Sequence, residues 1–174
     1  MNSLHQTAPR FGRLGRQIDV LPVLLAALSL GAGDAAPPLN GLEFLNGTSP
    51  APNTPMVVEF WATWCGPCVE QIPHWNSLAL TFKGRIQFVA ISAEDPETVE
   101  EFLKKRPMAG LVALDPDGTV HQAYGVAGIP STFVVDGKGT VRAVTTLSAL
   151  RDSDLQALIA GRPLQAKAAP PGSG

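Results

Sequence analysis

The chain has 174 residues, a formal net charge of −2 and an apolar content of 45%. This length suits one domain with terminal extensions, and the apolar content is enough to bury a core. Lysine and arginine are scattered, so the sequence lacks the concentrated basic patch that binds nucleic acid, and we expect no nucleic-acid partner. Its two cysteines, Cys65 and Cys68, cannot build a disulfide scaffold. A bond between them would close too small a loop to constrain the unfolded chain much.

Residues 1–36 have the order of a secretory leader. Three arginines precede the apolar run Val20–Leu30, and small residues follow it as far as Ala36. The run is shorter than the ~20 apolar residues that a membrane-spanning helix needs. We therefore predict a signal peptide or an N-terminal membrane anchor at 1–36, and export to the periplasm or cell envelope. The alternative is an amphipathic or buried helix of the folded domain.

Strand and helix patterns alternate through residues 37–162, which we expect to form the folded domain. Asp95 and Pro96 have the residue types of an N-cap and a first helical turn, and Pro73 should kink the helix that contains it. The expected elements are, in chain order, strands at 42–45 and 56–61, a helix at 65–82, a strand at 86–91, a helix beginning at 96, a strand at 111–114, a short helix at 120–124, strands at 132–135 and 140–147, and a helix at 152–160.

This order of elements predicts an α/β fold in which helices flank a central mixed β-sheet. The sequence DGKG between the last two strands is a hairpin signal. The last helix should end near Gly161. Residues 163–174 are expected to form a flexible C-terminal tail.

The two cysteines have the spacing of a redox pair, Cys65-Gly66-Pro67-Cys68. Residues three apart on a helix share one face, which suits the Cα separation of roughly 4.4–6.8 Å in a disulfide. At a helix N-terminus, free N–H groups and the macrodipole lower a thiol pKa, so Cys65 is the candidate attacking thiolate. Cys68 would resolve the mixed disulfide. Gly66 would let a substrate backbone approach closely, and Pro67 would rigidify the first helical turn.

Other interpretations of the cysteine pair need ligands or motifs that can be checked in the sequence. A structural zinc site needs a second Cys pair or a spaced His pair, and His5, His74 and His121 have no such spacing. A c-type haem would need His directly after the second cysteine, where the chain has Val69. We therefore expect no metal and no cofactor. Two inert buried cysteines remain the alternative.

The run VVEFWATWCGPC from Val57 resembles the active site of the thioredoxin superfamily. Downstream, GIPSTFVVD resembles the segment in which that family keeps a cis-proline facing the cysteines, and Pro73 matches its kinked active-site helix. A charged helix and a short strand are inserted before the cis-proline segment. With the export pattern, this insert is similar to the TlpA/ResA-like reductases of the bacterial cell envelope. The resemblance covers residues 39–161. The peroxidase relatives carry a single-cysteine motif after a Thr, which this chain lacks.

Glu59 lies within the apolar strand run MVVEFW. The resemblance implies a buried acid beneath Cys68, usually an aspartate in this family. Burial raises the pKa of a carboxyl, which could then accept the proton of Cys68 during its attack. The alternative is a residue on the solvent face of an edge strand.

Five more residues receive roles, and those of Pro130, Ile129 and Glu94 come from the resemblance. Pro130 would be the cis-proline, and the main chain of Ile129 would pair with a substrate strand. Trp61 would lie in the core and Trp64 on the rim of the site. Glu94 begins the insert, where reductases of this group place an acid near the active site; a solvated loop residue is the alternative.

The resemblance thus implies an exported protein-disulfide reductase that acts through a Cys65 mixed disulfide. Its clients would be thiol proteins such as apocytochrome c or copper-site proteins, its electrons would come from a membrane thiol donor, and it would work as a monomer. Two alternatives stay open. One is a general disulfide oxidase or reductase with other clients. The other is a module that binds a client or copper through its thiols without turnover.

Overall fold

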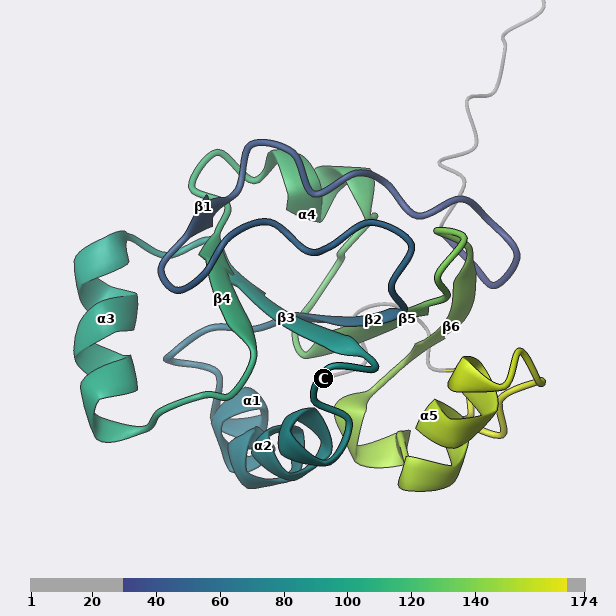
Figure 1. Cartoon of the computed structure of the whole chain (residues 1–174). Helices are drawn as coiled ribbons and strands as arrows, with labels where there is room; N and C mark the ends of the chain where they lie inside the picture. The colour runs from purple at the N-terminus through teal and green to yellow at the C-terminus, as the bar shows by residue number, and fades with distance from the viewer. Residues whose placement is uncertain (1–29, 169–174) are drawn as a thin grey trace, which may run out of the picture.

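The computed structural model describes residues 30–168. These residues form a six-stranded mixed sheet and the helices that flank it (Figure 1). The strand order is β1-β4-β3-β2-β5-β6. The elements are β1 (Glu43–Phe44), β2 (Met56–Phe60), α1 (Gly66–Glu70), α2 (Ile72–Thr81), β3 (Gln87–Ser92), α3 (Pro96–Lys105), β4 (Leu111–Leu114), α4 (Thr119–Ala123), β5 (Ser131–Val135), β6 (Val141–Thr145), the 3₁₀ turn η1 (Leu147–Ala149) and α5 (Asp152–Ile159).

The sheet combines parallel and antiparallel pairs, as the sequence predicted. Strand β2 runs parallel to β3, and β3 runs parallel to β4. Strand β5 is antiparallel to β2, and β6 is antiparallel to β5. Strand β1 is antiparallel to β4 at the other edge of the sheet. Every strand lies within two residues of its expected position, and the charged helix and short strand before residue 130 are α3 and β4. The last expected strand is shorter, because Leu147 is buried in the 3₁₀ turn instead of extending β6.

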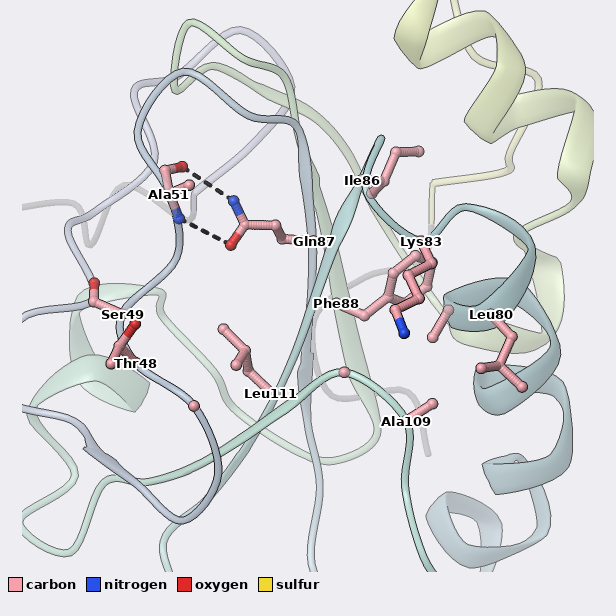
Figure 2. A pocket seen from close by; sticks show the side chains of 13 residues that line it. Thr48, Ser49, Ala51, Leu80, Lys83, Ile86, Gln87, Phe88, Ala109 and Leu111 are labelled. Carbon is pink, nitrogen blue, oxygen red and sulfur yellow. Dashed lines mark hydrogen bonds between the residues drawn. The ribbon is translucent and has the colours of Figure 1, made fainter.

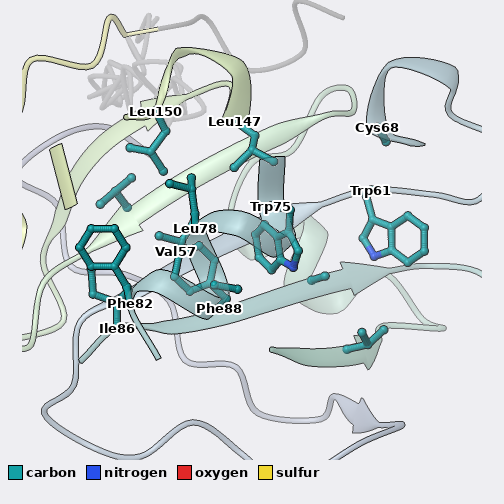
Figure 3. Close-up of a cluster of buried hydrophobic side chains, with 14 of the residues drawn as sticks. Val57, Trp61, Cys68, Trp75, Leu78, Phe82, Ile86, Phe88, Leu147 and Leu150 are labelled. Atoms are coloured by element: carbon teal, nitrogen blue, oxygen red, sulfur yellow. The ribbon is translucent and has the colours of Figure 1, made fainter. Parts of the chain in front are cut away.

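A hydrophobic core covers each face of the sheet, and the alternation of side chains along β2 assigns residues to them. Val57 belongs to the core beneath α1, α2 and α5, whereas Val58 and Phe60 belong to the core beneath α4. Figure 3 shows the first core extending from Phe82 through Trp75 to Trp61 and Cys68. Glu59, two residues after Val57, therefore lies on the face that carries the cysteines.

The active-site helix is divided more completely than the sequence analysis expected. One kinked helix was predicted, but α1 ends at Glu70 and α2 begins at Ile72, with Gln71 between them. Pro73 lies in the first turn of α2. It has no N–H to donate to the preceding turn, so the hydrogen-bond ladder is interrupted there.

The inserted segment around α3 is fixed to α2 by side-chain hydrogen bonds. Asn76 donates to the Pro107 carbonyl at 2.9 Å and accepts from the Ala109 N–H at 2.7 Å. Trp75 Nε1 donates to the Ala109 carbonyl at 2.7 Å. At the other end of the insert, the Asp95 side chain accepts from the Thr98 N–H, which confirms the expected N-cap.

Described residues beyond both ends of the expected domain contact it. Residues 31–36, assigned to the leader, lie beside β6, where an Ala35–Thr140 bridge extends the pairing. Residues assigned to the flexible tail also contact the domain, because Asp154 accepts from the main chain of Gln165 and Ala166. A buried carboxylate therefore holds this segment. The rest of the expected leader, 1–29, and of the expected tail, 169–174, lies outside the described residues.

Among residues 30–168, no helix has the length and apolar character to cross a membrane.

An apolar groove of about 700 Å³ opens between the end of α2 and the loop at 47–51 (Figure 2). The Gln87 side chain holds that loop by two hydrogen bonds to the Ala51 main chain. The groove is lined by the first residues of β3 and β4. Because these strands run parallel to β2, the groove lies at the opposite end of the sheet from the cysteines.

Candidate active site

Cys65 and Cys68 form a disulfide directly after the central strand β2. Their Cα atoms are 5.2 Å apart, within the range that a disulfide requires. Cys65 is the N-cap residue of α1, and its Sγ accepts a hydrogen bond from the Cys68 N–H at 3.2 Å. A hydrogen bond to sulfur favours the thiolate once the disulfide is reduced. The geometry therefore supports Cys65 as the anionic member of the pair.

Solvent exposure does not distinguish the two cysteines. Cys65 is 5% exposed and Cys68 6%. Their neighbours do differ. Cys65 lies between exposed Trp64 and Gly66, whereas Cys68 lines a small cavity that it shares with Glu59. A partner molecule that approaches along the surface meets the surroundings of Cys65 first.

Exposed residues lie beside the cysteine pair. Trp64 is 74% exposed, whereas Trp61 is buried in the core. Gly66 has no atom within 4 Å of the position that a Cβ would occupy, and Pro67 is exposed beside it. The fold itself therefore leaves room for a side chain at Gly66. The absence of one keeps that space open for an approaching backbone.

The Ile129–Pro130 peptide bond is cis, as the resemblance implied. Ser131, the next residue, begins β5 and is paired with Phe60 at the end of β2. The cis-proline therefore lies at the end of the sheet from which the cysteine loop leaves. Ile129 packs against both cores, so this loop is anchored on either face of the sheet.

Glu59 is buried in the middle of the sheet and is not on an edge strand. It is 4% exposed, and its carboxylate accepts a hydrogen bond from the Thr132 hydroxyl at 2.5 Å. Burial raises the pKa of Glu59 to about 8, although the hydrogen bond from Thr132 acts in the lowering direction. The carboxyl can therefore accept and release a proton near neutral pH.

A cavity of about 10 Å³ is lined by both Glu59 and Cys68. This is close to the smallest volume that holds one water molecule, about 10–15 Å³. Gln71 also lines it, and Gln71 Oε1 is buried without a hydrogen-bond partner among the described residues. The sequence analysis missed Gln71. The available signal was its position three residues after Cys68, which places both side chains on one helical face.

Glu94 is not a solvated loop residue. Its carboxylate accepts from the Thr63 N–H at 2.7 Å, from the Thr63 hydroxyl at 2.6 Å and from the Ser92 hydroxyl at 2.9 Å. Thr63 lies two residues before Cys65, so the insert is joined directly to the active-site loop. Sequence reasoning placed Glu94 near the site but gave no partner for it.

The ring of His74 is 3.0 Å from the Leu150 carbonyl, so this residue joins α2 to the turn before α5. Within residues 30–168, His, Cys, Asp and Glu side chains form no group of three with the arrangement of metal ligands.

The fold and the paired cysteines define a thioredoxin-like protein with a Cys-Gly-Pro-Cys disulfide. The AhpC/TSA family matches residues 47–144, more than half of the chain, so the chain belongs to this family.

Individual relatives agree with this assignment. The chain is 33% identical over 86 residues to the thiol-disulfide oxidoreductase ResA of Bacillus thuringiensis subsp. konkukian. That match covers 48% of this chain and 50% of the relative, so the chain spans about half the length of the curated relatives it matches.

Two solved structures show the same fold. One is a putative thiol:disulfide interchange protein DsbE from Chlorobium tepidum, with 30% identity, a TM-score of 0.61 and coverage of 76% of this chain and 98% of that one. The other is a secreted disulfide oxidoreductase of Mycobacterium tuberculosis, with 23% identity, a TM-score of 0.53 and coverage of 63% and 83%. The likeness to ResA-like proteins that the sequence indicated is therefore confirmed, and the structure comparison adds a likeness to a DsbE-type protein.

Proposed function

We propose that this protein is an exported thiol–disulfide oxidoreductase that reduces disulfides in client proteins. The observation that carries the proposal is the Cys65–Cys68 disulfide, placed beside the buried carboxyl of Glu59. A disulfide that closes so short a loop adds little to stability. Its position next to a group that titrates near neutral pH is instead suited to exchange chemistry.

The first step is attack by the reduced form of the protein. The Cys65 thiolate attacks one sulfur of a client disulfide, a new S–S bond joins Cys65 to the client, and the second client sulfur leaves as a thiolate that takes up a proton. The Cys68 N–H hydrogen bond stabilises the Cys65 thiolate before attack. Trp64 and the main chain of Ile129 border the client strand, with Pro130 between Ile129 and β5.

The second step releases the client. Cys68 gives its proton to Glu59, directly or through one water in the shared cavity, and its sulfur attacks Cys65. The Cys65–Cys68 bond forms, the bond between Cys65 and the client breaks, and the client sulfur leaves as a thiolate that takes up a proton from Glu59 or from water, so the client is released as a dithiol. The client has gained two electrons, and the protein has reached the oxidised form seen in the structure. A membrane thiol donor then reduces the pair again.

Reduction of a model protein tests the reaction. Wild-type protein should catalyse the reduction of insulin by dithiothreitol, and Cys65→Ala should be inactive. Stoichiometric copper binding without any insulin reduction would favour the thiol-binding module instead. The clients themselves, for which apocytochrome c and copper-site proteins are candidates, would be identified as adducts that remain on Cys65 in Cys68→Ala cells.

Export rests on the leader pattern of residues 1–36, and the similar M. tuberculosis structure belongs to a secreted protein. A reporter enzyme that is active only outside the cytoplasm, fused after Gly174, should be active. Loss of its activity when residues 1–29 are removed is the matched control, because this deletion keeps the contacts of residues 31–36 with β6. An inactive reporter on the full chain would contradict export, whereas recovery of the fusion with the membrane fraction would identify 1–36 as an uncleaved anchor.

A further inference from the structure

The carboxylate of Glu94 connects two parts of the molecule that are far apart in sequence. Two of its three hydrogen bonds come from Thr63, one from the main-chain N–H and one from the hydroxyl, and the third comes from Ser92. The Ser92 hydroxyl also accepts from the Glu94 N–H at 3.2 Å. Hydrogen bonds to a carboxylate are shorter and stronger than neutral ones. Hydrogen bonds with Ser92 thus fix Glu94 in place, and the Glu94 carboxylate in turn holds Thr63.

The supports of Glu94 are rigid. Ser92 is the last residue of β3 and is fully buried, and Asp95, directly after Glu94, is the N-cap of α3. Thr63, by contrast, belongs to the loop between β2 and α1. This loop also carries Trp64, whose side chain is exposed. The position of the loop therefore depends on a contact that the insert provides.

The other main-chain contacts of this loop lie on either side of Thr63. The Trp61 N–H donates to the Ile91 carbonyl at 3.1 Å, and the Cys65 N–H donates to the Ala62 carbonyl at 3.2 Å. The first bond fixes the start of the loop, and the second closes a turn within it. Between them, the two bonds from Thr63 to Glu94 hold the loop against β3.

We propose that Glu94 is a positioning residue, which acts through Thr63 to hold the Trp64 rim in the arrangement that receives a peptide segment of the client. This inference rests on the proposed function and deepens it, because it assigns client positioning to the insert. Glu94 does not touch the reacting sulfurs. Its loss should therefore slow attack on peptide disulfides much more than attack on a small disulfide that needs no rim. Resolution by Cys68 should be unaffected.

Two substitutions separate geometry from charge. Glu94→Ala removes all three hydrogen bonds. Glu94→Gln can keep them, because its carbonyl oxygen can accept from the Thr63 N–H and the Ser92 hydroxyl while its amide donates to the Thr63 hydroxyl. The matched control is Glu100→Ala, which removes an exposed carboxylate of α3 without contact to the loop. Thr63→Val is a second test with the carboxylate intact, because it removes only the hydroxyl bond.

The kinetic experiment measures the rate constant for attack by the reduced protein on a disulfide-bonded peptide and on Ellman's reagent. For Glu94→Ala we expect the peptide rate to fall by about 10- to 100-fold, since small misplacements can have effects of this size. The rate with Ellman's reagent should stay within about twofold, because Cys65 keeps its own hydrogen bond. Glu94→Gln should recover most of the peptide rate, Thr63→Val should lie between, and Glu100→Ala should match wild type.

Equal loss with both disulfides would overturn the proposal, because Glu94 would then act on the reactivity of Cys65. Glu94→Gln as slow as Glu94→Ala would also overturn it, since charge and not geometry would matter. Amide hydrogen exchange at Thr63 gives a readout that does not depend on activity. We expect the Thr63 amide to exchange faster in Glu94→Ala than in Glu100→Ala. Equal exchange would show that Glu94 does not hold Thr63 in place. Wild-type protein that attacks neither disulfide would contradict the proposed function. If Thr63 still exchanges faster in Glu94→Ala, the role of Glu94 in holding Thr63 would nevertheless be supported.

Discussion

Glu59 and Thr132 are direct partners across the β2–β5 pair, and the Thr132 hydroxyl donates a hydrogen bond to the Glu59 carboxylate. This contact places the acid in the middle of the sheet, on the face that carries Cys68. The surroundings determine its chemistry. Burial raises its pKa to about 8, and the hydrogen bond from Thr132 opposes part of that rise. The two residues thus set the pH range in which the carboxyl can exchange a proton with Cys68.

The raised pKa of Glu59 predicts a specific pH dependence of stability. Between the ordinary pKa of 4.5 and the folded value of about 8, the folded state binds one proton more than the unfolded state. The free energy of unfolding should therefore fall as pH rises through this window, by at most about 1.4 kcal/mol per pH unit from this group. Glu59→Gln lacks this contribution.

Urea unfolding of the oxidised proteins between pH 4.5 and pH 8 measures the difference. The stability of Glu59→Gln relative to wild type should increase steadily across the window, because the amide stays neutral and can still accept from Thr132. Parallel stability curves for the two proteins would show that Glu59 has an ordinary pKa.

Thr132→Val should raise the pKa of Glu59 above its wild-type value. The substitution keeps the shape of the side chain but removes the hydrogen bond that favours the charged carboxylate, which shifts the pKa by on the order of one unit. Carboxyl titration followed by carbon NMR would measure this. Thr145→Val is the matched control, because Thr145 lies opposite Thr132 on β6 and bonds the Lys167 carbonyl instead. An unchanged pKa in Thr132→Val would contradict the role of this hydrogen bond.

Cys65 should react with iodoacetamide at least about tenfold faster than Cys68 in the reduced protein at neutral pH, because thiolate character controls the rate. Cys65 Sγ accepts the Cys68 N–H, whereas Cys68 shares a cavity with an acid. A short pulse followed by peptide mass mapping gives the ratio, and labelling in urea shows whether the two thiols are equally reactive when unfolded. The two cysteines are equally buried, so a difference in labelling has to come from their thiolate character. Equal labelling in the folded protein would therefore contradict the roles of Cys65 as nucleophile and Cys68 as resolving cysteine.

Removal of residues 163–174 should destabilise the protein by about 1–3 kcal/mol, since the buried Asp154 carboxylate would lose two of its hydrogen-bond donors and keep the Arg151 N–H. Asp154 is 1% exposed and accepts from Gln165 and Ala166, and Leu164 packs against the core. A chain that ends at residue 168 keeps these contacts and is the matched control. If both truncations leave the unfolding midpoint unchanged, the contacts contribute nothing.

Most of the fold follows from local patterns. The β2 run MVVEF predicts a strand because Val57, Val58 and Phe60 are β-branched or aromatic. The cap at Asp95 and the cysteine spacing are also local signals. Each of these expectations needed only neighbouring residues, which explains why they agree with the structure. The position of Glu59 beneath Cys68, by contrast, was implied by the resemblance.

The contacts that sequence analysis missed join residues distant in the chain. Thr63 and Glu94 are 31 residues apart, and neither has a neighbour that indicates the other. The polar segment near Gln165 resembles a tail because its anchor, Asp154, lies in a different element. Polar pairing of this kind depends on how the elements pack together.

Trapping of the mixed disulfide tests the central claim most directly. Reduced Cys68→Ala protein, mixed with a disulfide-bonded peptide, should accumulate a covalent adduct that mass spectrometry places on Cys65. Glu59→Gln should accumulate the same adduct transiently, because loss of a general base slows resolution by up to about 10²–10⁴-fold. Wild type should pass directly to the Cys65–Cys68 disulfide. An adduct on Cys68, or no adduct in Cys68→Ala, would contradict the account.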